Sequence, residues 1–261
     1  NRSWIRATLE MDTALAVGSR ASLEPTGTDM PVLKGPDGLP FIPGSSLKGV
    51  FRFQSERILR AVEKKPLLWA CDPFDSPCVS PERKNQLWEQ ANRADEIFAQ
   101  KVFAESCTAC RLFGSQWFAG RVSFKDAYLT NADALAMMTQ IRDGVGIDRD
   151  LGAARTSVKY DFETVSPGAC FGVEILVENL EDWEMGFLLA VLRLWEEGSI
   201  AIGGKTTRGA GWGTLKGLTI QRVDAANLTD YLVKGETRTE GADRFADALR
   251  KRLENKEGGH A

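Results

Sequence analysis

The chain has 261 residues, of which 43% are hydrophobic and 26% charged, a composition typical of a globular protein. Its net charge of −3 and pI near 5.5 argue against a module that grips nucleic acid through an overall basic surface, although a local groove can still be basic. Because the only histidine is His260, paired-histidine ribonuclease chemistry and Ser-His-Asp hydrolysis both lack their parts.

Alternating apolar and polar side chains predict a half-buried strand over residues 4–17. Residues 18–44 are rich in Gly, Pro, Ser, Thr and Asp and predict a long loop, of a length that is usually functional in a compact domain. A helix is expected next, with Ser45 or Ser46 as its cap and apolar residues at helical spacing as far as Val62.

Residues 64–118 break this pattern and contain most of the cysteines, so we interpret them as an insertion. The remaining elements are expected in the order strand, second insertion, strand, helix and one or two strands, over residues 120–129, 130–168, 170–178, 183–197 and 199–222. Without insertions the order is β-α-β-β-α-β, which predicts an α+β fold with a ferredoxin-like or RRM-like core. This domain would span residues 1–222, followed by a helical C-terminal tail at 223–261.

Segment 44–49, with the sequence GSSLKG, places a loop directly before the predicted helix. A helix N-terminus offers unpaired N–H groups and the positive end of a dipole, so it can bind a phosphate. The hydroxyls of Ser45 and Ser46 and the charges of Lys48 and Arg52 would add to such a site. A plain capped helix is the alternative.

A second glycine-rich segment, 203–211, superficially resembles a P-loop. That motif requires a glycine where this chain has Ser199, and it follows a strand, whereas this segment follows a predicted helix. We therefore reject an NTPase. Glycines let the backbone approach a ligand closely and basic side chains can meet phosphates, which gives further candidate contacts: Gly203, Gly204, Lys205, Thr206 and Arg208. A glycine-rich hairpin is the alternative.

Four of the five cysteines form two spaced pairs, Cys71-x6-Cys78 and Cys107-x2-Cys110. No apolar run is long enough to span a membrane and no signal peptide opens the chain, so we expect a cytoplasmic protein without disulfides. Two such pairs predict a zinc site of four thiolates, which would be structural because it leaves the metal no open position. This argues against a zinc-dependent enzyme for a small molecule. Free thiols are the alternative.

Asp29 lies within the long predicted loop, directly before Met30 and Pro31. Judged from the surrounding residues alone, it is an ordinary turn aspartate. Several other aspartates compete with it as carboxylates for chemistry: Asp12, Asp37, Asp126, Asp148 and Asp150.

Together, these segments resemble the backbone subunits of type III CRISPR effector complexes, members of the RAMP superfamily. The resemblance follows the family's order along the chain, over residues 29–32, 38–49, 107–115, 120–127, 146–149, 152–154, 162–165 and 203–213. It implies a zinc knuckle in the first insertion and a β-hairpin thumb in the second. It also implies a subunit that stacks with other subunits along a CRISPR RNA.

In cleaving members of this family, a loop aspartate cuts the target RNA where the thumb kinks the guide–target duplex. The resemblance assigns that role to Asp29, with Mg²⁺ or another divalent ion as cofactor. It thus predicts a metal-dependent endoribonuclease that cleaves target RNA in the assembled complex. A subunit that holds the guide RNA without cutting is the alternative.

Many relatives carry a histidine in the first loop where this chain has Ala16, and Arg20 is expected to take over the guide contact there. The complete set of expected RNA-binding residues is Arg20, Ser45, Ser46, Lys48, Arg52, Gly203, Gly204, Lys205, Thr206 and Arg208. Because these residues would contact phosphates, binding should not depend on base identity.

Overall fold

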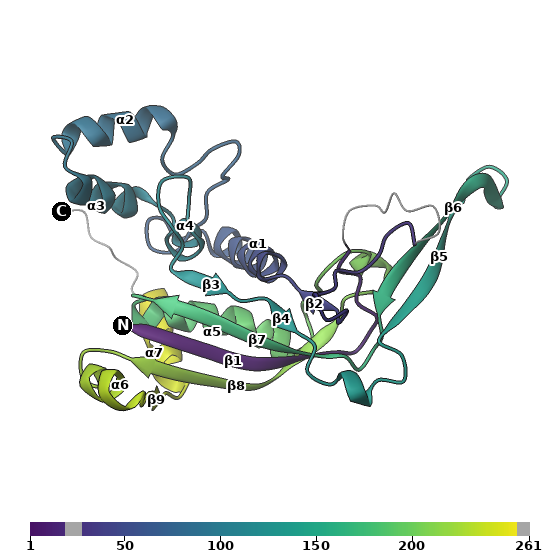
Figure 1. Ribbon diagram of the computed structural model, residues 1–261. Helices are drawn as coiled ribbons and strands as arrows, with labels where there is room; N and C mark the ends of the chain where they lie inside the picture. Colours follow the sequence, from purple (N-terminus) through teal and green to yellow (C-terminus); the bar gives the residue numbers. More distant parts are fainter. Residues whose placement is uncertain (19–27, 255–261) are drawn as a thin grey trace.

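The computed structural model describes residues 1–18 and 28–254 (Figure 1). A five-stranded sheet forms its centre, and every pair of neighbouring strands in it is antiparallel. In spatial order its strands are β3 (Val122–Phe124), β7 (Cys170–Glu178), β1 (Arg2–Met11), β8 (Gly213–Val223) and β9 (Arg238–Thr239). With the helices, it makes a mixed α/β architecture with antiparallel sheets, as the sequence predicted at that coarse level.

Two long helices, α1 (Gly44–Val62) and α5 (Asp182–Glu196), pack against one face of this sheet. The rings of Phe51 on α1 and Trp195 on α5 are fully buried, with centroids 5.2 Å apart. They share one apolar core with Leu9 of β1. Burying a side chain the size of Phe51 contributes about 1.5–3 kcal/mol, so this layer fixes the helices on which candidate site residues lie.

The segment after β8 is packed onto the same core. It contains α6 (Leu228–Lys234), β9 and α7 (Asp243–Glu254). Phe245 of α7 is fully buried against α5. A Cβ at Gly186 of α5 would lie 2.1 Å from the carbonyl oxygen of Phe245, so only glycine allows this close approach.

The start of α1 differs from the sequence prediction. The N-cap residue is Pro43, and neither Ser45 nor Ser46 caps the helix with its side chain, so that prediction was wrong. Instead, the backbone N–H of Gly44 donates to Oδ1 of Asp126 at 2.7 Å. A carboxylate that is distant in sequence therefore satisfies the first helical N–H, a partnership that local pattern rules cannot detect.

Residues 64–118 form a small helical layer beside the core (Figure 1). Its helices are α2 (Pro81–Gln90), α3 (Asp95–Glu105) and α4 (Thr108–Phe113). Ser80 caps α2, with Pro81 at the first helical position, which is a favoured combination at a helix start. A separate apolar cluster holds α2 against α3: Val79, Leu87 and Val102.

Two further pairs of strands lie outside the main sheet. One pair is β2 (Phe41–Ile42) with β4 (Ala127–Tyr128). The other is β5 (Thr139–Ile147) with β6 (Ala154–Val165), a hairpin that projects from the core after the short turn η1 (Ala132–Ala134) (Figure 1). The second insertion, predicted over 130–168, therefore contains a hairpin.

One strand prediction was too long, and the prediction of one or two strands over 199–222 agrees with the structure. The strand expected over 4–17 ends at Met11, because the N–H groups of Asp12 and Thr13 both donate to the carbonyl of Trp212 and the chain leaves the sheet. The region 199–222 contains one strand, β8, preceded by the short turn η2 (Thr206–Arg208).

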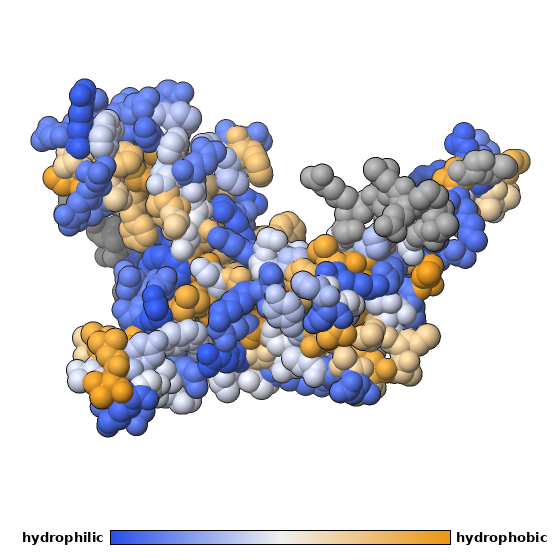
Figure 2. Space-filling model, in the orientation of Figure 1, coloured by the Kyte–Doolittle hydropathy of each residue, from blue (hydrophilic) through white to orange (hydrophobic). Residues whose placement is uncertain are grey.

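The sheet face opposite α5 and α7 carries charged pairs. They are Arg2–Glu178, Arg6–Glu174, Lys125–Glu174 and Lys216–Glu10. Polar and intermediate residues dominate this face in Figure 2. Within residues 1–18 and 28–254, no helix combines the length and the apolar character that crossing a membrane requires.

Candidate functional site

The predicted cysteine pairs meet at one point, and we call Cys71, Cys78, Cys107 and Cys110 the cysteine cluster. All four sulfurs lie within 4.8 Å of one another. The Sγ atoms of Cys107 and Cys110 are each 3.7 Å from that of Cys71. Four thiolates at ~2.3 Å from a tetrahedral zinc ion would be roughly 3.8 Å apart, so the cluster can hold a metal ion such as zinc.

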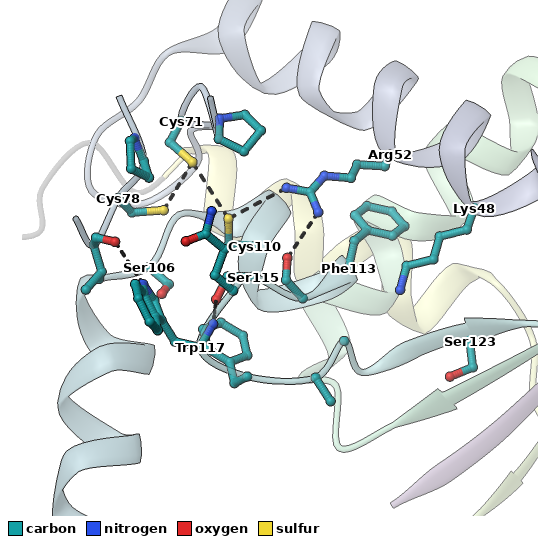
Figure 3. Close-up of a pocket in the computed structure, with 18 residues that line it drawn as sticks. Lys48, Arg52, Cys71, Cys78, Ser106, Cys110, Phe113, Ser115, Trp117 and Ser123 are labelled. Carbon is teal, nitrogen blue, oxygen red and sulfur yellow. Dashed lines mark hydrogen bonds between the residues drawn. The ribbon is translucent and has the colours of Figure 1, made fainter. Parts of the chain in front are cut away.

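The local backbone supports thiolates in this cluster, three of whose members, Cys71, Cys78 and Cys110, are drawn in Figure 3. The N–H of Cys107 donates to Sγ of Cys78 at 3.3 Å, and the N–H of Cys110 donates to Sγ of Cys107 at 3.4 Å. Cys107 is also the N-cap of α4, where the helix dipole favours negative charge. Hydrogen bonds from Cys110 and the other thiols hold the pKa of Cys107 below its usual range, whereas hydrogen bonds to Cys107 raise the pKa of Cys78 and of Cys110. The backbone N–H donors and the helix dipole suit ligands that must lose a proton to bind metal.

Two residues predicted to bind RNA lie beside this cluster. Lys48 and Arg52 line a cavity of about 640 Å³ that also includes Trp117 and Ser123 (Figure 3). Arg52 is already engaged within the protein: it donates to Glu56 at 2.8 Å and to the carbonyl of Gly114 at 3.1 Å. Lys48 has no salt bridge among the described residues, so it is the freer cation of the pair.

The other two residues of this segment lie in the first turn of α1. Ser45 is exposed and Ser46 half-buried. Both therefore remain near the helix N-terminus that the sequence proposed as a phosphate site, although Asp126 occupies the N–H of Gly44. Arg20 lies outside the residues that the structure describes.

Asp29 is exposed and lies against the hairpin, beside Asp161 of β6. The two residues exchange hydrogen bonds: the N–H of Asp29 donates to Oδ1 of Asp161 at 2.7 Å, and the N–H of Asp161 donates to Oδ2 of Asp29 at 3.0 Å. Each carboxylate is thus held by the other residue's backbone. Sequence reasoning missed Asp161, because nothing in the pattern of a strand indicates which loop will dock on it.

The chain on either side extends this contact, and we call residues 28–34 the Asp29 loop. Met30 forms a parallel bridge with Phe162, and the N–H of Glu163 donates to the Met30 carbonyl at 2.9 Å. The Glu163 carboxylate accepts hydrogen bonds from the Val32 N–H at 3.1 Å and from Lys34 Nζ at 2.7 Å. Burial raises the pKa of Glu163, but the hydrogen bonds, led by that from Lys34, outweigh burial and hold it below its ordinary value.

The glycine-rich segment also reaches the hairpin. The ammonium of Lys205 lies 4.1 Å from the ring centroid of Phe162 and 5.0 Å from that of Tyr160. Arg208 donates to the Tyr160 hydroxyl at 3.0 Å, which lowers the pKa of Tyr160. Lys205, Arg208 and both rings line a cavity of about 190 Å³.

The glycines of this segment serve close backbone contacts. A Cβ at Gly203 would lie 2.5 Å from the carbonyl oxygen of Ala16, and the N–H of Gly204 donates to that same oxygen at 2.8 Å. Thr206 begins η2. The glycine-rich hairpin remains the alternative to an RNA contact: Ala201 and Trp212 pair in an isolated antiparallel bridge, and the 3₁₀ turn η2 lies between them.

Four of the five competing aspartates have structural partners. Asp37 and Asp148 accept N–H groups within their own turns, from Leu39 and from Asp150 and Leu151. Asp12 accepts the Thr214 hydroxyl, and Asp126 caps α1. Among these candidates, Asp29 is the one that the structure joins to the hairpin across 132 residues of sequence.

The family model of the RAMP superfamily matches residues 8–215. The match covers most of the chain, including strands β3 and β7 of the main sheet, the cysteine cluster, the Asp29 loop and the hairpin. The chain therefore belongs to the RAMP superfamily. Membership suggests a CRISPR-associated role in binding RNA. It also suggests CRISPR RNA and other Cas subunits as partners. Some members of the superfamily are nucleases. No curated protein matches the chain.

Proposed function

We propose that this chain is a CRISPR RNA-binding backbone subunit of a type III effector complex, and that it cleaves guide-complementary target RNA with Asp29. The observation that carries this proposal is the docking of the Asp29 loop on β6, at the hairpin. A hairpin that kinks a guide–target duplex would distort the RNA beside its own strands. A carboxylate attached there would meet the distorted phosphate.

The fold fits this role. We interpret residues 1–222 as a ferredoxin-like palm, because the strand order β3-β7-β1-β8 is antiparallel throughout and α1 and α5 share one face. The first insertion would be a zinc knuckle and the β5–β6 hairpin the thumb. Residues from 223 on would form the helical tail. Such a complex would act on transcripts in the cytoplasm.

The guide would lie against the N-terminal part of α1 and the glycine-rich segment. Of the predicted contacts, Lys48, Ser45, Lys205 and Arg208 keep exposed or half-buried polar atoms. They would contact phosphates, so binding would be independent of guide sequence. Arg52 would contribute its positive charge to the same phosphate site, from its position beside Lys48.

The chemistry we propose is attack by the RNA's own 2′-hydroxyl on the adjacent phosphate, which closes a 2′,3′-cyclic phosphate and breaks the phosphorus bond to the 5′-oxygen of the next nucleotide. That oxygen leaves as a hydroxyl after taking a proton from water. Asp29 would accept the proton or hold a divalent ion, while the hairpin and its base align the 2′-oxygen with the phosphate. Such an ion, when bound, would stabilise charge that develops on the phosphate. The residues fit it: Mg²⁺ is typically held by one or two carboxylates together with substrate phosphates, and Oδ1 of the Asp29 carboxylate accepts no hydrogen bond among the described residues.

The decisive experiment compares Asp29→Ala with the parent chain in the assembled complex, using guide-matched RNA. Cutting should fall at least ~100-fold while folding and guide binding stay intact, the usual scale for losing a general base or metal-positioning group. Products should end in a 2′,3′-cyclic phosphate and require a divalent ion. Asp148→Ala and Asp126→Ala serve as comparisons. Normal cutting by Asp29→Ala would refute the assignment.

The second candidate is a subunit that binds and holds the guide without cutting. It is favoured by the same structure, since the guide-binding surfaces do not depend on Asp29. A parent complex that binds matched RNA but never cuts it would establish this role.

A further inference from the structure

Asp161 is the residue of the hairpin that forms hydrogen bonds with Asp29, among the residues that the structure describes. We propose that Asp161 is a positioning residue, which fixes Asp29 to the hairpin so that the cutting carboxylate follows the hairpin's position. This inference rests on the proposed function of Asp29. It assigns no chemistry to Asp161 itself.

The geometry of the Asp29–Asp161 pair supports a positioning role for Asp161. A carboxylate oxygen of each residue accepts the backbone N–H of the other, at 2.7 and 3.0 Å. Two acidic side chains would otherwise repel each other, and the two N–H dipoles offset that repulsion. Among the described residues, Oδ1 of Asp29 accepts no hydrogen bond, so the pairing leaves it free for RNA or an ion.

The contact between the Asp29 loop and β6 continues beyond the Asp29–Asp161 pair. Met30 forms an isolated bridge with Phe162, and the Glu163 carboxylate binds Val32 and Lys34, so the loop contacts β6 at several points from Asp29 to Lys34. Glu163 secures the far end of the Asp29 loop, whereas Asp161 secures Asp29. A loop fastened at both points moves with β6 as one body.

Asp143 provides a matched control. It lies on β5 directly opposite Asp161 in the hairpin register. Its carboxylate is 64% exposed and pairs with Lys159 at 3.2 Å, on the hairpin itself. Asp143 carries the same charge as Asp161 and lies on the same hairpin, but within the described part of the chain it forms no hydrogen bond with Asp29.

The test uses Asp161→Ala, Asp161→Asn and Asp143→Ala. Alanine removes the acceptor for the Asp29 N–H, whereas asparagine keeps a carbonyl oxygen at that place and removes only the charge. We expect Asp161→Ala to slow single-turnover cutting by about 10- to 100-fold without weakening target binding, since small misplacements carry losses of that size. Asp161→Asn and Asp143→Ala should cut nearly as the parent complex does.

A second readout does not depend on cutting. Hydrogen exchange at the amides of the Asp29 loop should accelerate in Asp161→Ala and stay slow in Asp161→Asn and Asp143→Ala. Exchange in β1 and α5 reports whether the variant remains folded.

Each outcome decides the question. If Asp29→Ala abolishes cutting but Asp161→Ala cuts normally, the proposed function stands and the positioning role is overturned. If Asp161→Asn fails as completely as Asp161→Ala, the charge matters and Asp161 is a ligand rather than a positioning residue. If Asp29→Ala cuts normally, the proposed function fails and this inference fails with it, whatever the exchange data show.

Discussion

Nη2 of Arg52 lies 3.9 Å from Sγ of Cys110, so a core helix reaches directly into the cysteine cluster. Arg52 belongs to α1 and Cys110 to α4, in the first insertion. Four thiolates around a zinc ion carry a net charge of about −2, and a guanidinium beside them offsets part of it. The cysteine cluster and α1 therefore form one structural unit.

Purified protein should contain one zinc ion per chain. Cys110→Ser should lower zinc content and thermal stability together, because the free energy of metal binding becomes part of the free energy of folding. Elemental analysis and thermal unfolding measure both. Cys170→Ser is the control, since Cys170 lies on β7 outside the cluster. Protein without zinc, with all four cluster thiols freely titratable, would contradict the prediction.

Lys48 and Arg52 should separate guide binding from stability. Arg52→Ala should lower the free energy of unfolding by about 1–3 kcal/mol, because Glu56 and the Gly114 carbonyl lose their partner. Lys48→Ala should change it by less than about 0.5 kcal/mol. Lys48→Ala should instead weaken binding equally for different guides and flatten its salt dependence.

Lys234→Ala, an exposed lysine on α6, is the control for Lys48→Ala. Chemical denaturation and RNA titration at several salt concentrations measure the two effects. A loss restricted to guides with one base at one position would count against phosphate contact.

Gly144→Ala should disturb Tyr160. A Cβ at Gly144 would lie 2.3 Å from the Tyr160 ring, which must then leave its place beside Arg208. The hydrogen bond from Arg208 lowers the pKa of Tyr160, so that pKa should rise in the variant. Ultraviolet titration can follow it after Tyr128→Phe and Tyr231→Phe, since the chain has three tyrosines.

Val145→Ala is the control for this change, because Val145 is exposed on the same strand. It should leave the Tyr160 titration where it was. An unchanged titration in Gly144→Ala would show that the ring is not held by Arg208 in solution.

The salt bridge between Glu163 and Lys34 should make the stability of the folded protein depend on pH. The pKa of Glu163 is lowered on folding, so its contribution is present above the ordinary glutamate pKa of ~4.3 and is lost as pH falls through the lower folded value. Glu163→Gln should therefore be less stable than the parent at pH 7, and the difference should shrink below about pH 4.

Thermal unfolding between neutral and acidic pH measures this difference. Glu196→Gln, which changes an exposed carboxylate on α5, should show no comparable dependence. A constant difference between Glu163→Gln and the parent at all pH values would mean that charge is not the cause.

Helices and strands could be predicted from the sequence where the pattern of apolar residues depends only on neighbours in the chain. The alternation in β7 and the helical spacing in α5 predicted both elements to within a residue or two of their ends. The spacing of Cys107 and Cys110 indicated a knuckle, and the structure brings Cys71 and Cys78 to it. These features depend on neighbours in the chain.

What could not be predicted depends on contacts between distant segments. Asp126 caps a helix that begins 82 residues earlier, and Asp161 holds a loop 132 residues earlier. Arg52 was predicted from its charge to bind RNA. Its hydrogen bond to Glu56 is local, but its hydrogen bond to the carbonyl of Gly114 depends on where that distant segment folds. Periodicity identifies an element, whereas a single sequence does not identify what packs against its end.

The central place of β1 has a consequence for how the protein is made. It pairs with β7 from Arg2 to Glu10 and with β8 from Arg2 to Met11, so both of its edges are completed by segments far along the chain. During synthesis β1 emerges before β7 and β8 and must wait, with both edges unpaired, until these two strands have left the ribosome. Contacts of such long range also slow folding. We therefore expect newly made chains to depend on chaperones during this interval, and to be most prone to aggregation before β8 is complete.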